Sequence, residues 1–224
     1  MPSAPEFWKY FDEAAAPHLM HRAEGFRQIF AYLDRFDRPI GIIETGCMRK
    51  DYDWGDGKST LLFTRYAAWH PGSVVYSVDL DPTAVEFCRT TVGEVRLHCG
   101  DSVLFLKSLA DQPPADLAAI DLLYLDSYDV DFDNPLPSAI HHLKELAAIA
   151  PLLSAETLVV VDDSPLSVFA IPGRSGELRL ISQPRVSGKA KLVAEYAMQV
   201  GAQRVISDYQ MGWTGIGRRT GNPG

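Results

Sequence analysis

Short apolar runs recur along the chain and alternate with segments of helical periodicity. Runs rich in Val, Leu and Ile are typical of strands buried on both faces of a parallel sheet. Between them, apolar residues recur every three or four positions, as in amphipathic helices. This alternation predicts right-handed crossovers and an α/β fold with a doubly wound, mostly parallel sheet. The expected strands are 40–44, 74–78, 95–99, 120–125 and 157–161, with a final pair near 204–208 and 212–216; the expected helices are 59–69, 83–89, 103–109, 137–149 and 189–200.

Aromatic residues precede the first expected strand. Apolar positions at helical spacing between Phe26 and Phe36 predict an amphipathic helix, and segment 7–11 predicts a shorter one. Their apolar surface has three possible destinations: the crevice at the strand ends, a homodimer interface, or the outside of the sheet. We expect an N-terminal helical appendage over 1–38, an α/β domain over 39–217 and a flexible tail over 218–224.

Composition narrows the class of protein. The 224 residues are 46% hydrophobic and 22% charged, as in soluble globular proteins. A net charge of −8 argues against a nucleic-acid or anionic-membrane surface. The chain has no apolar run long enough to span a bilayer and no basic, apolar leader. Three cysteines without metal-type spacing are expected to be reduced thiols of a cytoplasmic protein.

Carboxylates follow two of the expected strands. Asp126 ends the run 120–125, and the adjacent pair Asp162 and Asp163 ends the run 157–161. Residues just past the carboxyl ends of parallel strands line the ligand crevice, so these side chains should converge if the strands are neighbours. Three carboxylates together require a neutralising cation, which predicts a Mg²⁺ site. The alternative is that each carboxylate only caps a helix or accepts from loop amides.

Polar and glycine residues mark the ends of the first three strands. Gly46 permits a tight turn against a ligand, and a hydroxyl such as Ser59 can cap the next helix. An acidic residue after the second strand can accept hydrogen bonds from a ribose diol. Each of these residues alone could also have a purely structural role, as a helix cap or a turn residue. The residues concerned are Glu44, Gly46, Ser59, Asp79, Asp101 and Ser102.

The order of these residues resembles that of the class I S-adenosylmethionine-dependent methyltransferases over about residues 40–216. The closer resemblance is to their metal-dependent O-methyltransferases, of the catechol, caffeoyl-CoA and macrocin types. It implies S-adenosylmethionine bound by the six residues just named, and magnesium bound by Asp126, Asp162 and Asp163. It also implies methyl transfer to a small-molecule hydroxyl that the metal orients and acidifies.

Two departures from that family stand out. The loop 47–56 is enlarged, and it either reaches the cofactor or substrate or is a solvated insertion. Where the catechol-type enzymes have a lysine three residues after the first metal carboxylate, this chain has Asp129. Asp129 is therefore our candidate general base, with a plain loop carboxylate as the alternative.

Other functions remain open from the sequence. Gly57, Lys58 and Ser59 resemble the end of a P-loop, which would make the chain a kinase or NTPase, although Tyr52 stands where that motif requires glycine. A non-catalytic binding module with a cofactor-type fold is a third possibility. The turn-rich segment 166–188 is either a substrate lid or a surface excursion without a role. The acceptor is open among a catechol, a sugar hydroxyl and a modified amino acid.

Overall fold

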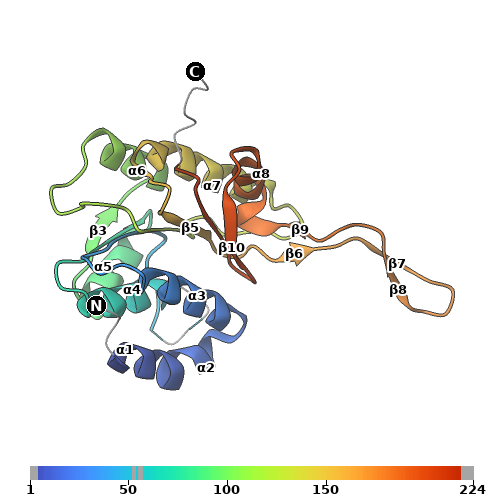
Figure 1. Ribbon diagram of the computed structural model, residues 1–224, viewed down its shortest axis with the longest axis horizontal. Helices are drawn as coiled ribbons and strands as arrows, with labels where there is room; N and C mark the ends of the chain where they lie inside the picture. Colours follow the sequence, from blue (N-terminus) through green and yellow to red (C-terminus); the bar gives the residue numbers. More distant parts are fainter. Residues whose placement is uncertain (1–4, 52–53, 55–57, 218–224) are drawn as a thin grey trace.

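A seven-stranded sheet with helices on both faces forms the body of the protein (Figure 1). This computed structural model describes residues 5–51, 54 and 58–217. The predicted tail, 218–224, lies outside the described residues, as do Tyr52 and Gly57 of the P-loop alternative.

The sheet has the order β10-β11-β5-β4-β1-β2-β3. Strands β1 to β5 are parallel to one another, whereas β11 runs antiparallel to both β5 and β10. This confirms the predicted doubly wound, mostly parallel α/β class. The bounds are β1 Gly41–Thr45, β2 Val74–Asp79, β3 Arg96–Cys99, β4 Leu122–Leu125, β5 Leu158–Val161, β10 Gln203–Ser207 and β11 Met211–Thr214.

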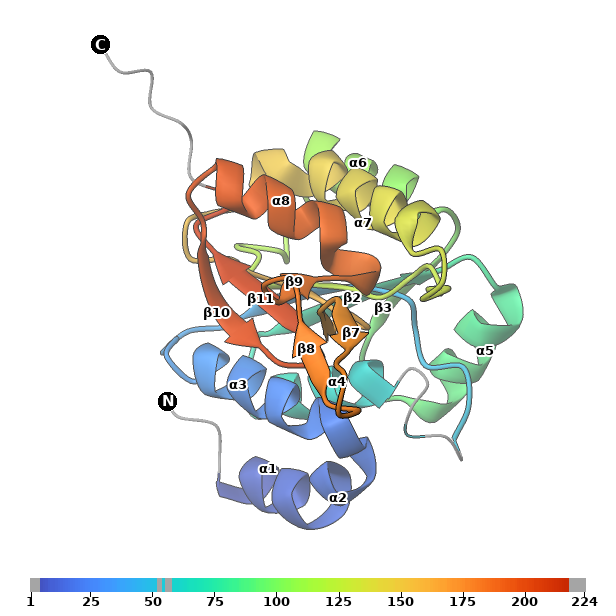
Figure 2. The same ribbon diagram turned by 90° about the vertical axis from the view of Figure 1, so that its right-hand side faces the viewer.

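Helices cover both faces of the sheet, as Figure 2 shows. Strands β1, β4 and β5 are buried along their whole length because both of their faces are covered. One face carries α6 Ser102–Asp111, α7 Leu136–Ile149 and α8 Lys191–Gln199, and the other carries α3 Ala23–Leu33, α4 Lys58–Ala68 and α5 Pro82–Thr91. No helix among the described residues is long and apolar enough to cross a membrane.

The N-terminal segment packs against the outside of the sheet layer. It comprises α1 Pro5–Tyr10, the π-helical η1 Phe11–Ala15, α2 Ala16–Leu19 and the 3₁₀ turn η2 Met20–Arg22, ahead of α3. The rings of Phe7 and Phe30 lie 4.7 Å apart, and Phe26 stacks 5.8 Å from Tyr124 of β4. These rings belong to one buried cluster with strand residues. Of the three possible destinations for this apolar surface, the structure shows packing on the sheet face.

Segment 166–188 forms an antiparallel arm that projects from the body (Figure 1). At its base β6 Leu166–Ser167 pairs with β9 Arg185–Val186, and further out β7 Ala170–Pro172 pairs with β8 Leu178–Leu180. Strands of two or three residues are too short to give a periodic signal, which is why the sequence indicated only a turn-rich connection. The arm carries exposed apolar side chains, with Phe169 74% exposed and Leu178 72% exposed.

Candidate active site

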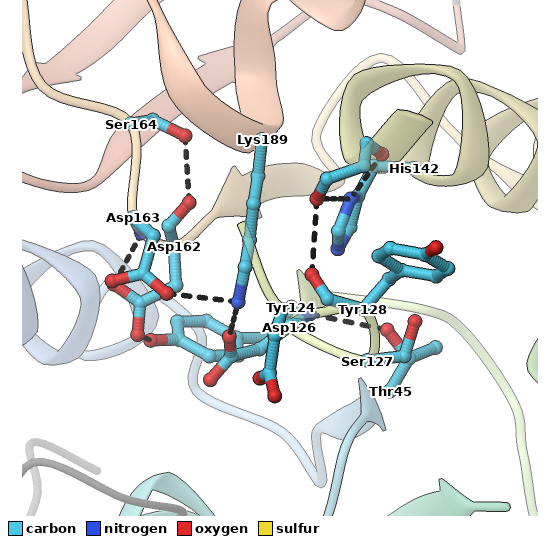
Figure 3. Close-up of polar contacts among 12 residues, drawn as sticks. Thr45, Tyr124, Asp126, Ser127, Tyr128, His142, Asp162, Asp163, Ser164 and Lys189 are labelled. Atoms are coloured by element: carbon cyan, nitrogen blue, oxygen red, sulfur yellow. Dashed lines mark hydrogen bonds and ion pairs between the residues drawn. The ribbon is translucent and has the colours of Figure 1, made fainter. Parts of the chain in front are cut away.

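The candidate site lies at the carboxyl ends of β1, β4 and β5. The chain winds from β1 toward β3 in one direction and from β4 toward β5 in the other, so the switch point falls between β1 and β4. In open α/β sheets this is where ligands bind. Thr45, Asp126 and Asp162 therefore meet at one edge of the sheet (Figure 3).

Gly46 makes the turn after β1 possible. Its φ is +88°, and a Cβ built on it would lie 2.6 Å from the carbonyl oxygen of Asp126. Only glycine fits this conformation and this close approach. The chain then crosses the end of β2, where the amide of Cys47 donates to Asp79 Oδ2 at 3.1 Å.

Asp79 and Asp101 stand at the ends of β2 and β3. Asp79 is partly exposed, and its Oδ1 accepts from the amide of Asp81 at 2.9 Å. A carboxylate oxygen has more than one lone pair, so Asp79 can still accept from a ligand hydroxyl. Leu80 beside it is 74% exposed and offers an apolar face to a ligand. Asp101 is exposed and caps α6 by accepting from the amide of Leu104 at 2.9 Å.

Glu44 and Ser59 are buried beneath the Gly46 turn. Glu44 Oε2 accepts from Thr60 Oγ1 at 2.6 Å and from Ser77 Oγ at 2.8 Å. Thr60 Oγ1 in turn accepts from the amide of Met48 at 3.0 Å. Ser59 Oγ and Glu44 Oε1 are buried without a hydrogen-bond partner among the described residues. Glu44 therefore supports the turn from below through Thr60, whereas Ser59 lies buried in the first turn of α4.

Glu44 should make the stability of the protein depend on pH. Burial raises its pKa from the ordinary 4.5 to about 7, despite hydrogen bonds from hydroxyl groups. The folded protein therefore holds this proton more tightly than the unfolded chain, and stability falls as pH rises from about 4.5 to about 7. We expect Glu44→Gln to remove about 3 kcal/mol of this fall. Urea unfolding at about pH 4.5 and about pH 7 measures this change in the free energy of unfolding. An equal loss of stability between the two pH values in the wild type and in Glu44→Gln would contradict the prediction.

Asp162 is neutralised by Arg22. Its side chain is fully buried, and Oδ2 accepts from Arg22 Nη1 at 2.7 Å and from the hydroxyl of Tyr124 at 2.6 Å. Oδ1 accepts from the amide of Asp163 at 2.9 Å. Burial alone would raise the pKa of Asp162, but Arg22 and then Lys189 hold it below its ordinary value. Arg22 also donates to the carbonyl of Trp54 at 2.8 Å, which ties η2 to the loop after β1.

Lys189 pairs with both of the other two carboxylates. Its Nζ contacts Asp126 Oδ1 and lies 2.9 Å from Asp163 Oδ2 (Figure 3). The sequence predicted a helix from residue 189, but α8 begins at Lys191 and Lys189 lies in the 3₁₀ turn η4 Gly188–Ala190. The expected helix is therefore present, but its first two residues belong to the 3₁₀ turn that leads into α8.

The predicted magnesium ligands meet but do not form a cation site as they stand. Mg²⁺ requires carboxylate oxygens free to coordinate in near-octahedral geometry. Here each of Asp126, Asp162 and Asp163 contacts an ammonium or guanidinium group. Within the described part of the chain, no group of three His, Cys, Asp or Glu side chains is arranged to hold a metal ion. The residues present therefore do not fit the metal that the sequence resemblance implies.

Asp129, the predicted base, lies apart from this cluster of charges. Its carboxylate is 81% exposed and lies 3.4 Å from Arg49 Nη2, in the loop after β1. The structure thus leaves Asp129 facing solvent, although it also shows that the loops following β1 and β4 approach each other.

A buried carboxylate that the sequence did not indicate lies on α7. Glu145 is fully buried and accepts from Ser127 Oγ at 2.5 Å and from Thr45 Oγ1 at 3.3 Å. His141 Nε2 lies 3.4 Å from Glu145 and 3.0 Å from Ser102 Oγ. Burial would raise the pKa of Glu145, but hydrogen bonding to His141 helps to lower it. The spacing of four residues between His141 and Glu145 places both on one helix face, and this was the available signal.

No protein-family model and no curated protein matches the chain. Several solved structures match the chain at low sequence identity. DesVI of Streptomyces venezuelae has a TM-score of 0.48 at 10% identity, covering 95% of this chain and 97% of that one. The sugar N-methyltransferase KedS8 of Streptoalloteichus sp. has 0.46 at 11%, covering 93% and 91%.

A further similar structure is MycE, a methyltransferase from the mycinamycin pathway in complex with Mg, SAH and mycinamycin VI. It has a TM-score of 0.45 at 17% identity, covering 72% of this chain. The match spans 37% of MycE's length. The function proposed below therefore rests on the residues of this chain.

Proposed function

We propose that the protein is an S-adenosylmethionine-dependent methyltransferase that acts on a hydroxyl group of a small molecule. The observation that carries this proposal is the joint placement of Gly46, Asp79 and Asp101 at the ends of three adjacent strands, in the order predicted for this cofactor. In this proposal the tight glycine turn brings the backbone close to the methionine end, Asp79 accepts from the ribose hydroxyls, and Leu80 and Asp101 lie on the adenine side.

The cofactor supplies a methyl group on a sulfonium, and the chain's own residues bind and orient the acceptor. Asp126 and Asp163 are the partly exposed carboxylates of the charge cluster, at 14% and 31%. Either can accept a hydrogen bond from an acceptor hydroxyl and so direct its lone pair toward the cofactor. A protein of net charge −8 favours a small acceptor over a nucleic acid. Magnesium dependence is not part of this proposal, because the carboxylates already face two cations.

The kinase or NTPase alternative gains no support. Its phosphate-binding lysine would be Lys58, but Lys58 is 2% exposed and donates to the carbonyl and the carboxylate of Asp51, at 2.6 and 2.9 Å. A lysine held in this way is not available to a phosphate group. The absence of the strand-end carboxylates would have favoured a non-catalytic binding module. Asp126, Asp162 and Asp163 are all present, so nothing favours that alternative.

Calorimetric titration with S-adenosylhomocysteine, and separately with ATP, tests the proposal. We expect the wild-type protein to bind S-adenosylhomocysteine, and Asp79→Ala to weaken that binding by about 1–3 kcal/mol, roughly fivefold to 150-fold, because charge-assisted hydrogen bonds to the diol are lost. Asp111→Ala, at the far end of α6, is the control and should bind as the wild type does. Binding of ATP alone would sink the proposal, and unchanged affinity in folded Asp79→Ala would place the ribose elsewhere.

A further inference from the structure

Lys189 is a buried lysine in the middle of the three strand-end carboxylates. Its side chain is 2% exposed, and its Nζ bridges Asp126 of β4 and Asp163 of β5. A buried ammonium group is unfavourable unless it is paired, and here its paired state stabilises both carboxylates. In Figure 3 the side chain descends from above the sheet into the space between the two aspartates.

The backbone of the residues before and after Lys189 fixes the position of its side chain. Gly188 has a φ of +63°, and a Cβ built on it would lie 2.0 Å from the carbonyl oxygen of Asp163. The amide of Lys189 donates to that oxygen at 3.2 Å, and the amide of Ala190 donates to Ser164 Oγ at 2.9 Å. The turn at 188–190 is thus bound directly to the end of β5.

The backbone of Asp163, which pairs with Lys189, has an unusual conformation. Its φ is +44°, a region that non-glycine residues enter rarely and at an energetic cost. This conformation and the ion pair with Lys189 occur at one residue.

The side chains of two cationic residues offset most of the negative charge of the cluster. Three carboxylates, Asp126, Asp162 and Asp163, face two cations, Arg22 and Lys189. Adding a divalent cation to this set would give an excess of positive charge. Without Lys189 the three carboxylates would face Arg22 alone, and the remaining two negative charges would match a divalent cation.

We propose that the Lys189 ammonium takes the place of a divalent cation at the ends of β4 and β5, so that this centre works without a metal ion. Given the methyl transfer proposed above, on which this inference rests, Lys189 is a positioning residue: it holds Asp126 and Asp163 in place to receive an acceptor hydroxyl. The acceptor would be oriented by carboxylates set by an internal cation, and not by direct coordination to a metal.

Manganese titration followed by electron paramagnetic resonance tests this inference without cofactor or acceptor. We expect the wild-type protein to leave the signal of free Mn²⁺ unchanged. Lys189→Ala should bind one Mn²⁺ at least about tenfold more tightly than the wild type, because two uncompensated carboxylate charges are exposed to it. Lys58→Ala also removes a buried lysine, but away from the three carboxylates, and should gain no such site.

Each outcome decides the question. One tight Mn²⁺ per wild-type chain, lost in Asp126→Asn, would show that a metal displaces Lys189 and would overturn the inference. No gain of binding in folded Lys189→Ala would also overturn it. Lys189→Gln, which keeps the size and hydrogen-bonding capacity of the side chain, replaces the alanine variant where that does not fold, with the same expected gain. Failure of S-adenosylhomocysteine to bind would remove the proposed function and leave these metal results standing.

Discussion

Replacing Arg22 with alanine is expected to lower the free energy of unfolding by about 3–5 kcal/mol, because it leaves the carboxylate of Asp162 buried without its cation. Asp162 is fully buried, and Arg22 lies 2.7 Å from it with 5% of its own side chain exposed. The guanidinium also lies 5.7 Å from the ring centre of Phe26 and donates to the carbonyl of Trp54. The truncation therefore removes packing as well as charge.

Urea unfolding of three variants separates the contributions. Arg27→Ala removes an arginine that is 41% exposed and paired with Asp12, and should cost less than about 1 kcal/mol. The double variant Arg22→Met with Asp162→Asn removes both charges, and should recover most of the loss, since no unpaired charge stays buried. An Arg22→Ala protein as stable as Arg27→Ala would show that Asp162 is not held by this ion pair.

Gly188→Ala is expected to cost about 2–4 kcal/mol, since it combines an unfavourable backbone conformation with a steric overlap. The φ of +63° disfavours any side chain, and the new Cβ would lie 2.0 Å from the carbonyl oxygen of Asp163. To relieve the overlap, the turn must move away from β5 and take Lys189 with it.

Gly201→Ala provides the matched comparison. Its φ of +68° is nearly the same, but a Cβ at this position meets no atom within 4 Å. Its cost should be about 1 kcal/mol, from backbone conformation alone. The difference between the two variants in thermal or chemical unfolding measures how closely the 188–190 turn contacts β5. Equal losses would mean that the turn can move freely, and the placement of Lys189 would lose its structural basis.

The apolar pattern predicted the sheet well because burial on both faces leaves a direct mark on the sequence. The run that ends at Val161 is buried along β5, and the run that ends at Leu125 is buried along β4. The pattern failed where elements are short or lack periodicity. The arm strands β7 and β8 have three residues each, and the start of the expected helix 189–200 is a 3₁₀ turn that periodicity does not distinguish from an α-helical turn.

The sequence located some residues of the candidate site correctly and misjudged the surroundings of others. Asp126 and Asp162 could be placed at one edge of the sheet because neighbouring parallel strands end together, and Gly46 could be assigned to a tight turn from its residue type. Glu44 was expected to face a ligand but is turned toward Thr60 and Ser77, since alternation along a strand does not tell which of two covered faces holds the polar partner.

The sequence by itself therefore determined the order of the strands and helices and the row of carboxylates at the strand ends, because these depend on local periodicity and on the direction of parallel strands. Only the tertiary structure decided which cations meet those carboxylates. Arg22 precedes Asp162 by 140 residues and Lys189 follows Asp126 by 63. Periodicity places a residue on a face of its own element, but an ion pair across such distances exists only where the packing of separate elements brings the two charges together out of water.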